Sequence, residues 1–169
     1  MTYKASFDTT VKILSTLITG AIAVIAVSYL INIFQAAMQG VAISAYAGKI
    51  VLVALLVGLV LFVFLFSVKN YTIENNSLHI NRWLNKVIIP FAEIKTVRVV
   101  TDADMGLVFR TFGVGGLFGY LGKFSSSKLG SLTYYATQNK NRVFIELHDG
   151  KKLLITPDDL ALAEQLNAK

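Results

Sequence analysis

Residues 50–68 read IVLVALLVGLVLFVFLFSV, an unbroken apolar segment without a charged side chain. A bilayer core about 30 Å thick needs about 20 apolar residues of α-helix, so this segment suits one membrane crossing. A second uncharged segment, residues 13–37, precedes it and is longer than one crossing needs. We expect two transmembrane helices, because a small soluble domain rarely buries two uncharged helices of this length.

The connection between these segments, about residues 39–49, is short, so the two helices must run antiparallel and both chain ends lie on one side. Basic residues near the two segments on the side of the chain ends are Lys4, Lys12, Lys69, Arg82 and Lys86. The connection contains only Lys49. Because Lys and Arg accumulate on the cytoplasmic side of membranes, we expect both termini in the cytoplasm.

Small residues recur at four-residue spacing in both segments, as in Thr16 and Gly20 and in Ala54 and Gly58. Such spacing lets helix backbones approach closely in lipid. It indicates a tight hairpin or a contact between copies of the chain, and it is also frequent by chance in apolar helices.

The composition excludes several classes of site. The chain of 169 residues has no cysteine and two histidines, which excludes disulfides and Cys-ligated metals and leaves little for other metal or cofactor sites. No Ser/His/Asp arrangement suggests a nucleophile, so we expect a protein that is not an enzyme. In so apolar a chain, the net charge of +6 favours anionic lipid as a partner. Nucleic acid is disfavoured because the aromatic residues lie among apolar neighbours and not in a dense basic run.

The part from Lys69 onward has the pattern of a small β domain with short connections, which predicts antiparallel pairing. About seven strands are expected, at residues 71–75, 78–84, 87–91, 95–100, 132–136, 142–147 and 151–155. In the second of these, alternation places Leu78, Ile80, Arg82 and Leu84 on one face. Thr156 as N-cap and Pro157 as the first helical residue predict a C-terminal helix.

A glycine- and aromatic-rich segment, residues 110–124, reads RTFGVGGLFGYLGKF. It matches neither the dinucleotide fingerprint nor a Walker loop. Three interpretations stay open: a loop packed into the mouth of the β domain, a loop dipping into the membrane interface, and a contact with a second copy or a partner subunit. The candidate membrane or partner contacts are Arg110, Phe112, Gly113, Gly115, Gly116, Leu117, Phe118, Gly119, Tyr120, Gly122, Lys123 and Lys128.

Three segments behind the two apolar helices resemble the bacterial pleckstrin-homology-like (PH-like) membrane proteins. They read NNSLHINRWLNKVIIPFAEIKTV, RTFGVGGLFGYLGKF and RVFIELHDGKKLLITPDD. The resemblance implies a strongly bent antiparallel barrel of seven strands, capped by a C-terminal helix. PH-like folds bind phospholipids, peptides or further copies of themselves, so the resemblance implies no single activity.

These observations predict a membrane α hairpin at residues 1–68 and an all-β PH-like domain at residues 69–169. We expect a multi-pass protein of the bacterial inner (cytoplasmic) membrane. Its β domain would contact anionic lipid headgroups or a protein partner through the glycine-rich segment. The alternative is a structural or accessory subunit of a larger membrane assembly, with a second copy or another membrane protein as partner.

Overall fold

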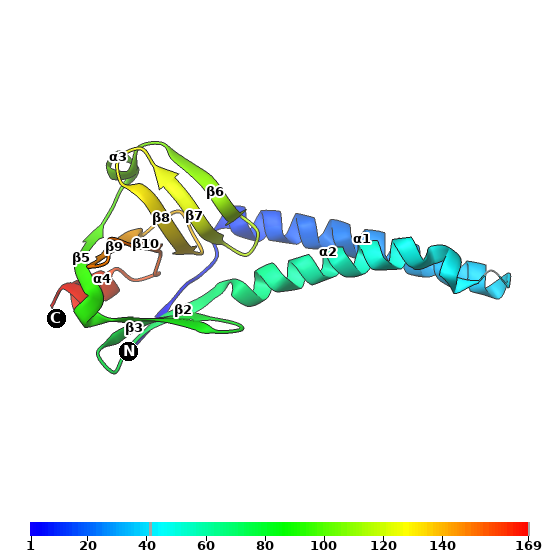
Figure 1. Cartoon of the computed structure of the whole chain (residues 1–169), viewed down its shortest axis with the longest axis horizontal. Coiled ribbons are helices and arrows are strands. Elements are labelled where there is room, and N and C mark those ends of the chain that lie inside the picture. The colour runs from blue at the N-terminus through cyan, green and yellow to red at the C-terminus, as the bar shows by residue number, and fades with distance from the viewer. Residues whose placement is uncertain (41, 169) are drawn as a thin grey trace.

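The computed structural model describes residues 1–40 and 42–168 and shows a β domain from which a long helical hairpin projects (Figure 1). Helix α1 spans Thr9–Met38 and helix α2 spans Ala47–Phe66, joined through the short 3₁₀ helix η1, Ile43–Tyr46. In their most apolar stretches, none of α1 and 6% of α2 is buried within the protein. The two helices therefore fit the expected transmembrane hairpin, because core helices of a soluble domain would be largely covered.

Helix α1 starts earlier than the apolar segment because Asp8 caps it, with the carboxylate accepting the N–H of Val11 at 2.8 Å. Val11 and Ser15 are buried against the β domain. From Thr16 to Met38 the helix has 23 residues, or about 34 Å at 1.5 Å per residue, and the 20 residues of α2 give about 30 Å. Both lengths suit a bilayer once the first turns of α1 are assigned to the β domain.

The described residues form ten strands in two sheets. The first sheet is antiparallel, with neighbouring strands in the order β1 (Thr2–Lys4), β2 (Val68–Glu74), β3 (Ser77–Arg82) and β4 (Lys86–Pro90). The second follows the order β5 (Ile94–Val99), β9 (Val143–Leu147), β10 (Lys152–Ile155), β8 (Gly130–Ala136), β7 (Tyr120–Ser126) and β6 (Val108–Gly115). Short helices complete the domain: η2 (Phe91–Glu93), α3 (Asp102–Met105) and α4 (Ala161–Asn167).

The predicted architecture of two apolar helices, a β domain and a C-terminal helix is confirmed, with corrections to the strands. Strand β1 and the two strands of the glycine-rich segment raise the expected seven to ten among the described residues. Strand β10 pairs with β9 on one side and with β8 on the other. Because β10 runs parallel to β8, the pairing is not antiparallel throughout. Strand β1 pairs with β2, so residues 2–4 pack with the β domain although they precede the hairpin.

Two apolar clusters hold the domain together. The larger lies between the sheets and includes Tyr71, Ile80 and Ile155, which are all fully buried, together with Leu162 of α4. The smaller lies on the other face of the six-stranded sheet, and Met105 of α3 covers it.

Tyr71 ties the sheets together because its hydroxyl donates to the carbonyl of Tyr135 at 2.6 Å and accepts the N–H of Thr156 at 3.1 Å. Thr156 is buried, and its own hydroxyl accepts the N–H of Thr137 at 3.0 Å. The expected N-cap is therefore engaged inside the domain, and α4 begins five residues later, at Ala161.

Candidate functional site

The glycine-rich segment is a β-hairpin, not the loop we expected. Strands β6 and β7 pair from Val108 opposite Ser126 to Gly115 opposite Tyr120, and the tip between them points towards the helices (Figure 1). Gly113 lies opposite Gly122, and both have positive φ angles, of 111° and 116°. A Cβ atom on Gly122 would overlap the carbonyl oxygen of Phe112, so the close approach of the two strands requires glycine here.

The tip of this hairpin, Gly116–Gly119, packs against both apolar helices. The hydroxyl of Ser15 in α1 accepts the N–H of Phe118 at 2.9 Å and donates to the carbonyl of Gly116 at 3.4 Å. The ring of Phe118 meets that of Phe64 in α2 edge-on, with centroids 5.2 Å apart. Among the three interpretations of the segment, the tip therefore comes nearest to a packed turn, although it packs on the membrane helices and not into a barrel mouth.

Strand β6 is one of the two edge strands of its sheet, and apolar side chains along and beside it are exposed. Leu107 is 69% exposed, Phe109 63% and Phe112 77%. Lys123, opposite Phe112 on β7, is exposed as well. Lys128 does not join this group, because it lies at the other end of β7, where its Nζ donates to the carbonyl of Ala103 in α3 at 2.7 Å.

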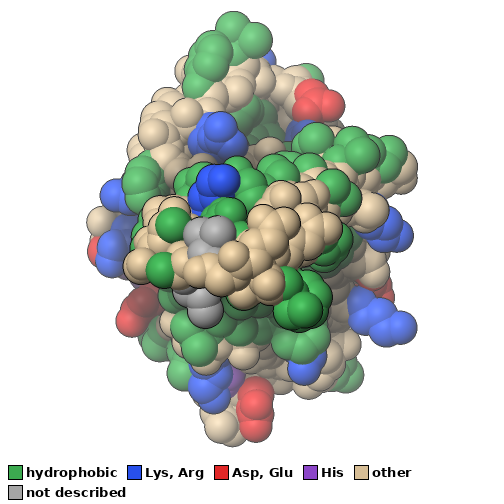
Figure 2. Space-filling model, turned by 90° about the vertical axis from the view of Figure 1, so that its right-hand side faces the viewer, with side chains coloured by type: hydrophobic (Ala, Val, Ile, Leu, Met, Phe, Trp, Pro, Cys, Tyr) green, Lys and Arg blue, Asp and Glu red, His purple; other side chains and the backbone are tan. Residues whose placement is uncertain are grey.

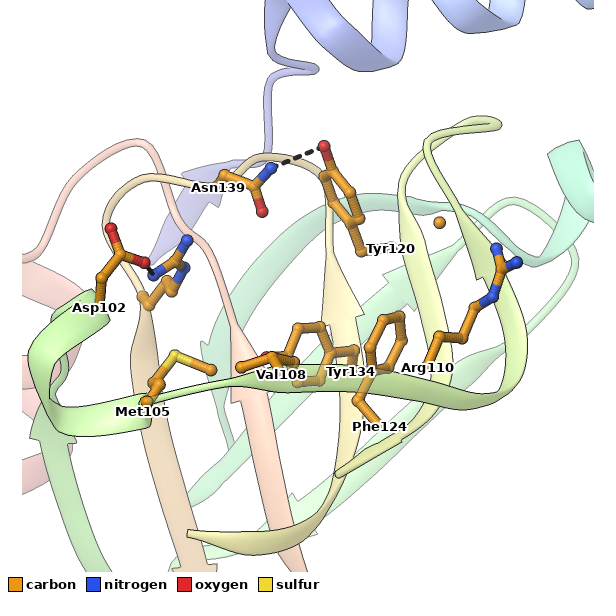
Figure 3. Close-up of a pocket in the computed structure, with 11 residues that line it drawn as sticks. Asp102, Met105, Val108, Arg110, Tyr120, Phe124, Tyr134 and Asn139 are labelled. Carbon is orange, nitrogen blue, oxygen red and sulfur yellow. Dashed lines mark hydrogen bonds and ion pairs between the residues drawn. The ribbon is translucent and has the colours of Figure 1, made fainter. Parts of the chain in front are cut away.

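Arg110, Gly115 and Tyr120 line a hollow of about 470 Å³ on the outer face of the six-stranded sheet (Figure 3). Its floor is apolar, with the rings of Phe124 and Tyr134 stacked at 4.1 Å. Burial raises the pKa of Tyr134 to about 12, so this phenol is neutral at physiological pH.

Most polar groups of this hollow already have partners. Arg142 forms an ion pair with Asp102, and the amide of Asn139 donates to the hydroxyl of Tyr120 at 2.7 Å (Figure 3). Because the charge of Arg142 is neutralised within the protein, the hollow has little left to attract an anion except Arg110 at its edge.

A second hollow, the membrane-side groove, lies on the opposite face of the sheet and has a volume of about 290 Å³. Alternation along β8 separates the two, since Tyr134 faces the outer hollow and Tyr135 faces this groove. Its lining residues are Phe62, Val63 and Phe66 of α2, Phe112, Gly113 and Val114 of β6, Leu121 and Gly122 of β7, Thr133 and Tyr135 of β8, and Arg82 of β3. Leu121 and Tyr135 also pack on the cluster between the sheets, so the groove is where that interior opens towards α2.

Beside the groove, the turn between β3 and β4 carries two large exposed side chains next to the end of α2. Trp83 is 50% exposed and Leu84 58%. Trp83 stacks on Phe64 with centroids 5.2 Å apart, the Nζ of Lys69 lies 4.9 Å from the Trp83 ring, and the N–H of Leu84 donates to the carbonyl of Leu65 at 2.9 Å. These contacts hold the turn beside the last turn of α2.

Sequence reasoning missed this turn and the groove. Two signals were available: a Trp-Leu pair soon after an apolar segment, typical of a membrane interface, and the placement of Arg82 on the same strand face as the buried Leu78 and Ile80.

Figure 2, which looks along the hairpin towards the β domain, shows Lys and Arg side chains on several sides of the hairpin.

One of three comparisons with known proteins gives a match. A family model described as a bacterial PH domain matches residues 69–169, which is more than half of the chain. No curated protein and no solved structure matches the chain significantly.

Proposed function

The chain belongs to the bacterial PH domain family, and we propose that it is a non-enzymatic binding module held by two membrane spans at the cytoplasmic face of the inner membrane. In this proposal the β domain contacts anionic lipid with the end from which the spans emerge. PH domains are in general lipid- or protein-binding modules, and two apolar helices indicate association with a membrane.

The observation that carries the proposal is the exposed Trp83–Leu84 turn beside the end of α2. Aromatic side chains with a polar edge favour the headgroup region of a bilayer. Lys86 follows this turn closely along the chain, and Lys69 lies beside the Trp83 ring in space. Each cation near an anionic surface adds about 1 kcal/mol of attraction. Phe112, which we predicted as a contact from sequence, lines the groove beside α2 and contributes further exposed apolar surface.

The charges at the two ends of the hairpin support cytoplasmic termini. Lys12 is exposed on the second turn of α1, and Lys4 and Lys69 lie in β1 and β2. At the far end Lys49 lies over the rings of Tyr29 and Tyr46, with its Nζ 5.8 and 5.3 Å from their centroids. The excess of cations at the β-domain end is the pattern of a cytoplasmic side.

Quenching of Trp83 fluorescence tests this proposal, because Trp83 is the single tryptophan of the chain. The full chain is reconstituted in phosphatidylglycerol vesicles that contain phospholipids brominated near the carbonyl end of the acyl chain. We expect strong quenching of Trp83. Emission that is insensitive to the brominated lipid would contradict the proposal.

The matched control moves the tryptophan away from the membrane by combining Trp83→Phe with Glu74→Trp. Glu74 is exposed at the end of β2, six residues from the start of that strand, or about 20 Å at 3.3 Å per residue. The control should show little quenching.

A second candidate function is that of a subunit in a membrane assembly, and the β6 edge favours it. An edge strand offers backbone groups on its outer side, and the exposed side chains of Phe109 in β6 and of Leu107 just before it offer apolar area to a second copy or a partner subunit. Phe109→Lys tests it: an oligomer of the full chain in mild detergent that dissociates with this substitution would favour this function, and an unchanged monomer would reject it.

A further inference from the structure

We propose that the membrane-side groove binds one anionic phospholipid of the adjoining leaflet, with the phosphate on Arg82 and an acyl chain along Phe62, Phe66 and Phe112. The proposal rests on the proposed function in one respect, namely that the groove lies at the membrane surface. It goes further because it assigns a discrete site, a stoichiometry and a residue that selects the headgroup.

Arg82 is the first observation. Its Nε is buried and has no hydrogen-bond partner among the described residues. Arg82 also takes part in none of the ion pairs between the described residues. Its guanidinium carbon lies 5.1 Å from the ring centroid of Phe66 and 5.7 Å from that of Tyr135. Aromatic faces stabilise a guanidinium in part, but a buried N–H donor without an acceptor is costly. The group is therefore suited to an anion from outside the chain.

The contrast with Arg142 strengthens this argument. Arg142 lines the outer hollow, and Asp102 neutralises it there. Arg82 lines the membrane-side groove, on the other face of the sheet. The other residues that line this groove are apolar apart from Thr133 and the hydroxyl of Tyr135. A planar guanidinium matches two phosphate oxygens at once, so Arg82 suits a phosphate diester better than a lysine would.

The walls of the groove are the second observation. Phe62 and Phe66 of α2 form one side, and their rings lie 4.6 Å apart. Val114 and Leu121 of the hairpin form the other side. Phe62 is 58% exposed on α2, so this side of the groove continues into the surface of the span that faces lipid. An acyl chain can therefore enter from the bilayer without crossing water.

The height of the site along the span is the third observation. Helix α2 ends at Phe66, and Arg82 lies against the ring of that residue. The end of a 20-residue span is where the hydrocarbon core meets the headgroups. A free phosphate would match Arg82 but leave the apolar walls uncovered. A zwitterionic phospholipid would cover the walls, but its own ammonium already balances its phosphate, so the charge of Arg82 would stay uncompensated. An anionic phospholipid satisfies both.

Native mass spectrometry of the delipidated full chain in detergent, titrated with dioleoylphosphatidylglycerol or dioleoylphosphatidylcholine, tests the proposal. We expect one phosphatidylglycerol per chain with an affinity at least tenfold above that for phosphatidylcholine. Arg82→Gln should remove this preference, and Arg82→Lys should retain part of it. Arg98→Gln is the matched control, because it removes an exposed arginine from β5, outside the groove, and should change the affinity less than twofold.

A second variant acts on the acyl chain and leaves Arg82 in place. Val114→Trp fills the groove and should abolish retention of phosphatidylglycerol, whereas Thr96→Trp, on the exposed surface of β5, should not. Millimolar inorganic phosphate should not displace the lipid. Circular dichroism confirms that each variant is folded.

Equal losses for Arg82→Gln and Arg98→Gln, equal binding of both lipids, or retention in Val114→Trp would overturn the site. Displacement by free phosphate would also overturn it, since the anion alone would then account for binding. Quenching of Trp83 by brominated lipid should persist in Arg82→Gln. If it does while the lipid preference is absent from the unsubstituted chain, the groove proposal fails and the proposed function stands.

Discussion

Two β-hairpins of this molecule reach the base of the membrane helices, and they meet it in opposite ways. The β6–β7 tip is engaged by the protein itself, since Gly116 and Gly119 are buried and Phe118 is bonded to Ser15. The β3–β4 tip keeps Trp83 and Leu84 half exposed. The conspicuous glycines mark where the chain approaches itself closely, and the plainer Trp-Leu turn marks the free surface.

Among the substitutions that test this contrast, Gly119→Ala should lower the stability of the protein most. Gly119 has a φ angle of 128°, and a Cβ there would lie 2.6 Å from the carbonyl oxygen of Ala136, so the backbone must shift. The φ angle alone costs about 1–3 kcal/mol for a residue with a Cβ, and the overlap adds to it. We expect a lowered melting temperature of the full chain in detergent, measured by circular dichroism.

Gly130→Ala is the control for this substitution. Gly130 also has a positive φ angle, of 75°, but a Cβ there meets open space. Its melting temperature should fall by clearly less. Equal losses for the two variants would mean that the close approach of the tip contributes nothing beyond backbone strain.

Ser15→Ala should have the next largest effect, because it removes the side chain that joins α1 to the tip. The partly buried N–H of Phe118 would lose its acceptor, which costs about 1 kcal/mol, the lower end of the range for buried donors. Limited proteolysis within residues 115–120 should accelerate. Ser28→Ala is the control, since among the described residues the Ser28 hydroxyl bonds only to Val24 of its own helix, and it should leave the cleavage rate unchanged.

Leu84→Ser should sharpen the contrast from the other hairpin. Leu84 is 58% exposed, so its replacement should change the free energy of unfolding in detergent by no more than about 0.5 kcal/mol. Quenching of Trp83 by brominated lipid should nevertheless decrease, because the turn loses apolar area at the interface. A stability loss as large as that of Ser15→Ala would show that this tip is structural too.

The smallest effect concerns the far end of the β6–β7 hairpin, where α3 leads into β6. Hydrogen bonds from the backbone N–H and the hydroxyl of Thr101 lower the pKa of Asp104. Because the folded pKa is the lower one, this contribution to stability is complete above the ordinary pKa of a carboxyl group. It is lost as the pH falls through the lowered value.

Thr101→Val removes the hydroxyl from this pair and should shift the pKa of Asp104 back towards its ordinary value, as measured by NMR titration. Trp83 emission should not change, since α3 lies away from the spans (Figure 1). A coupled change in emission would show that the two ends of the hairpin respond together.

Much of the fold follows from local signals in the sequence. The absence of charge marks both spans, and the Asn75–Asn76 pair adopts the left-handed turn, with φ angles of 48° and 58°, that joins β2 to β3. Strand alternation also places Leu78 and Ile80 inward, as the structure has them.

What the sequence does not reveal depends on contacts between distant segments. Glycine disfavours strands, so the pattern of residues 110–124 conceals β6 and β7, which are stabilised by pairing with each other and with β8. Thr156 has the chemistry of an N-cap, but Thr137 occupies its hydroxyl. The role of Arg82 depends on how close α2 lies to β8, which strand patterns do not encode.

The spacing of the elements around the hairpin determines how the β domain is mounted. Strand β1 ends at Lys4 and α1 starts at Thr9, while α2 ends at Phe66 and β2 starts at Val68. The two helices are therefore joined to the β domain through connections of four residues and of one residue. Ser15 of α1 and Phe64 of α2 also contact the tip of the β6–β7 hairpin. Because the connections are short and both helices pack on the domain, we expect the hairpin and the β domain to move together. A change in the tilt of the hairpin, as in a thinner or thicker bilayer, should turn the whole β domain with it.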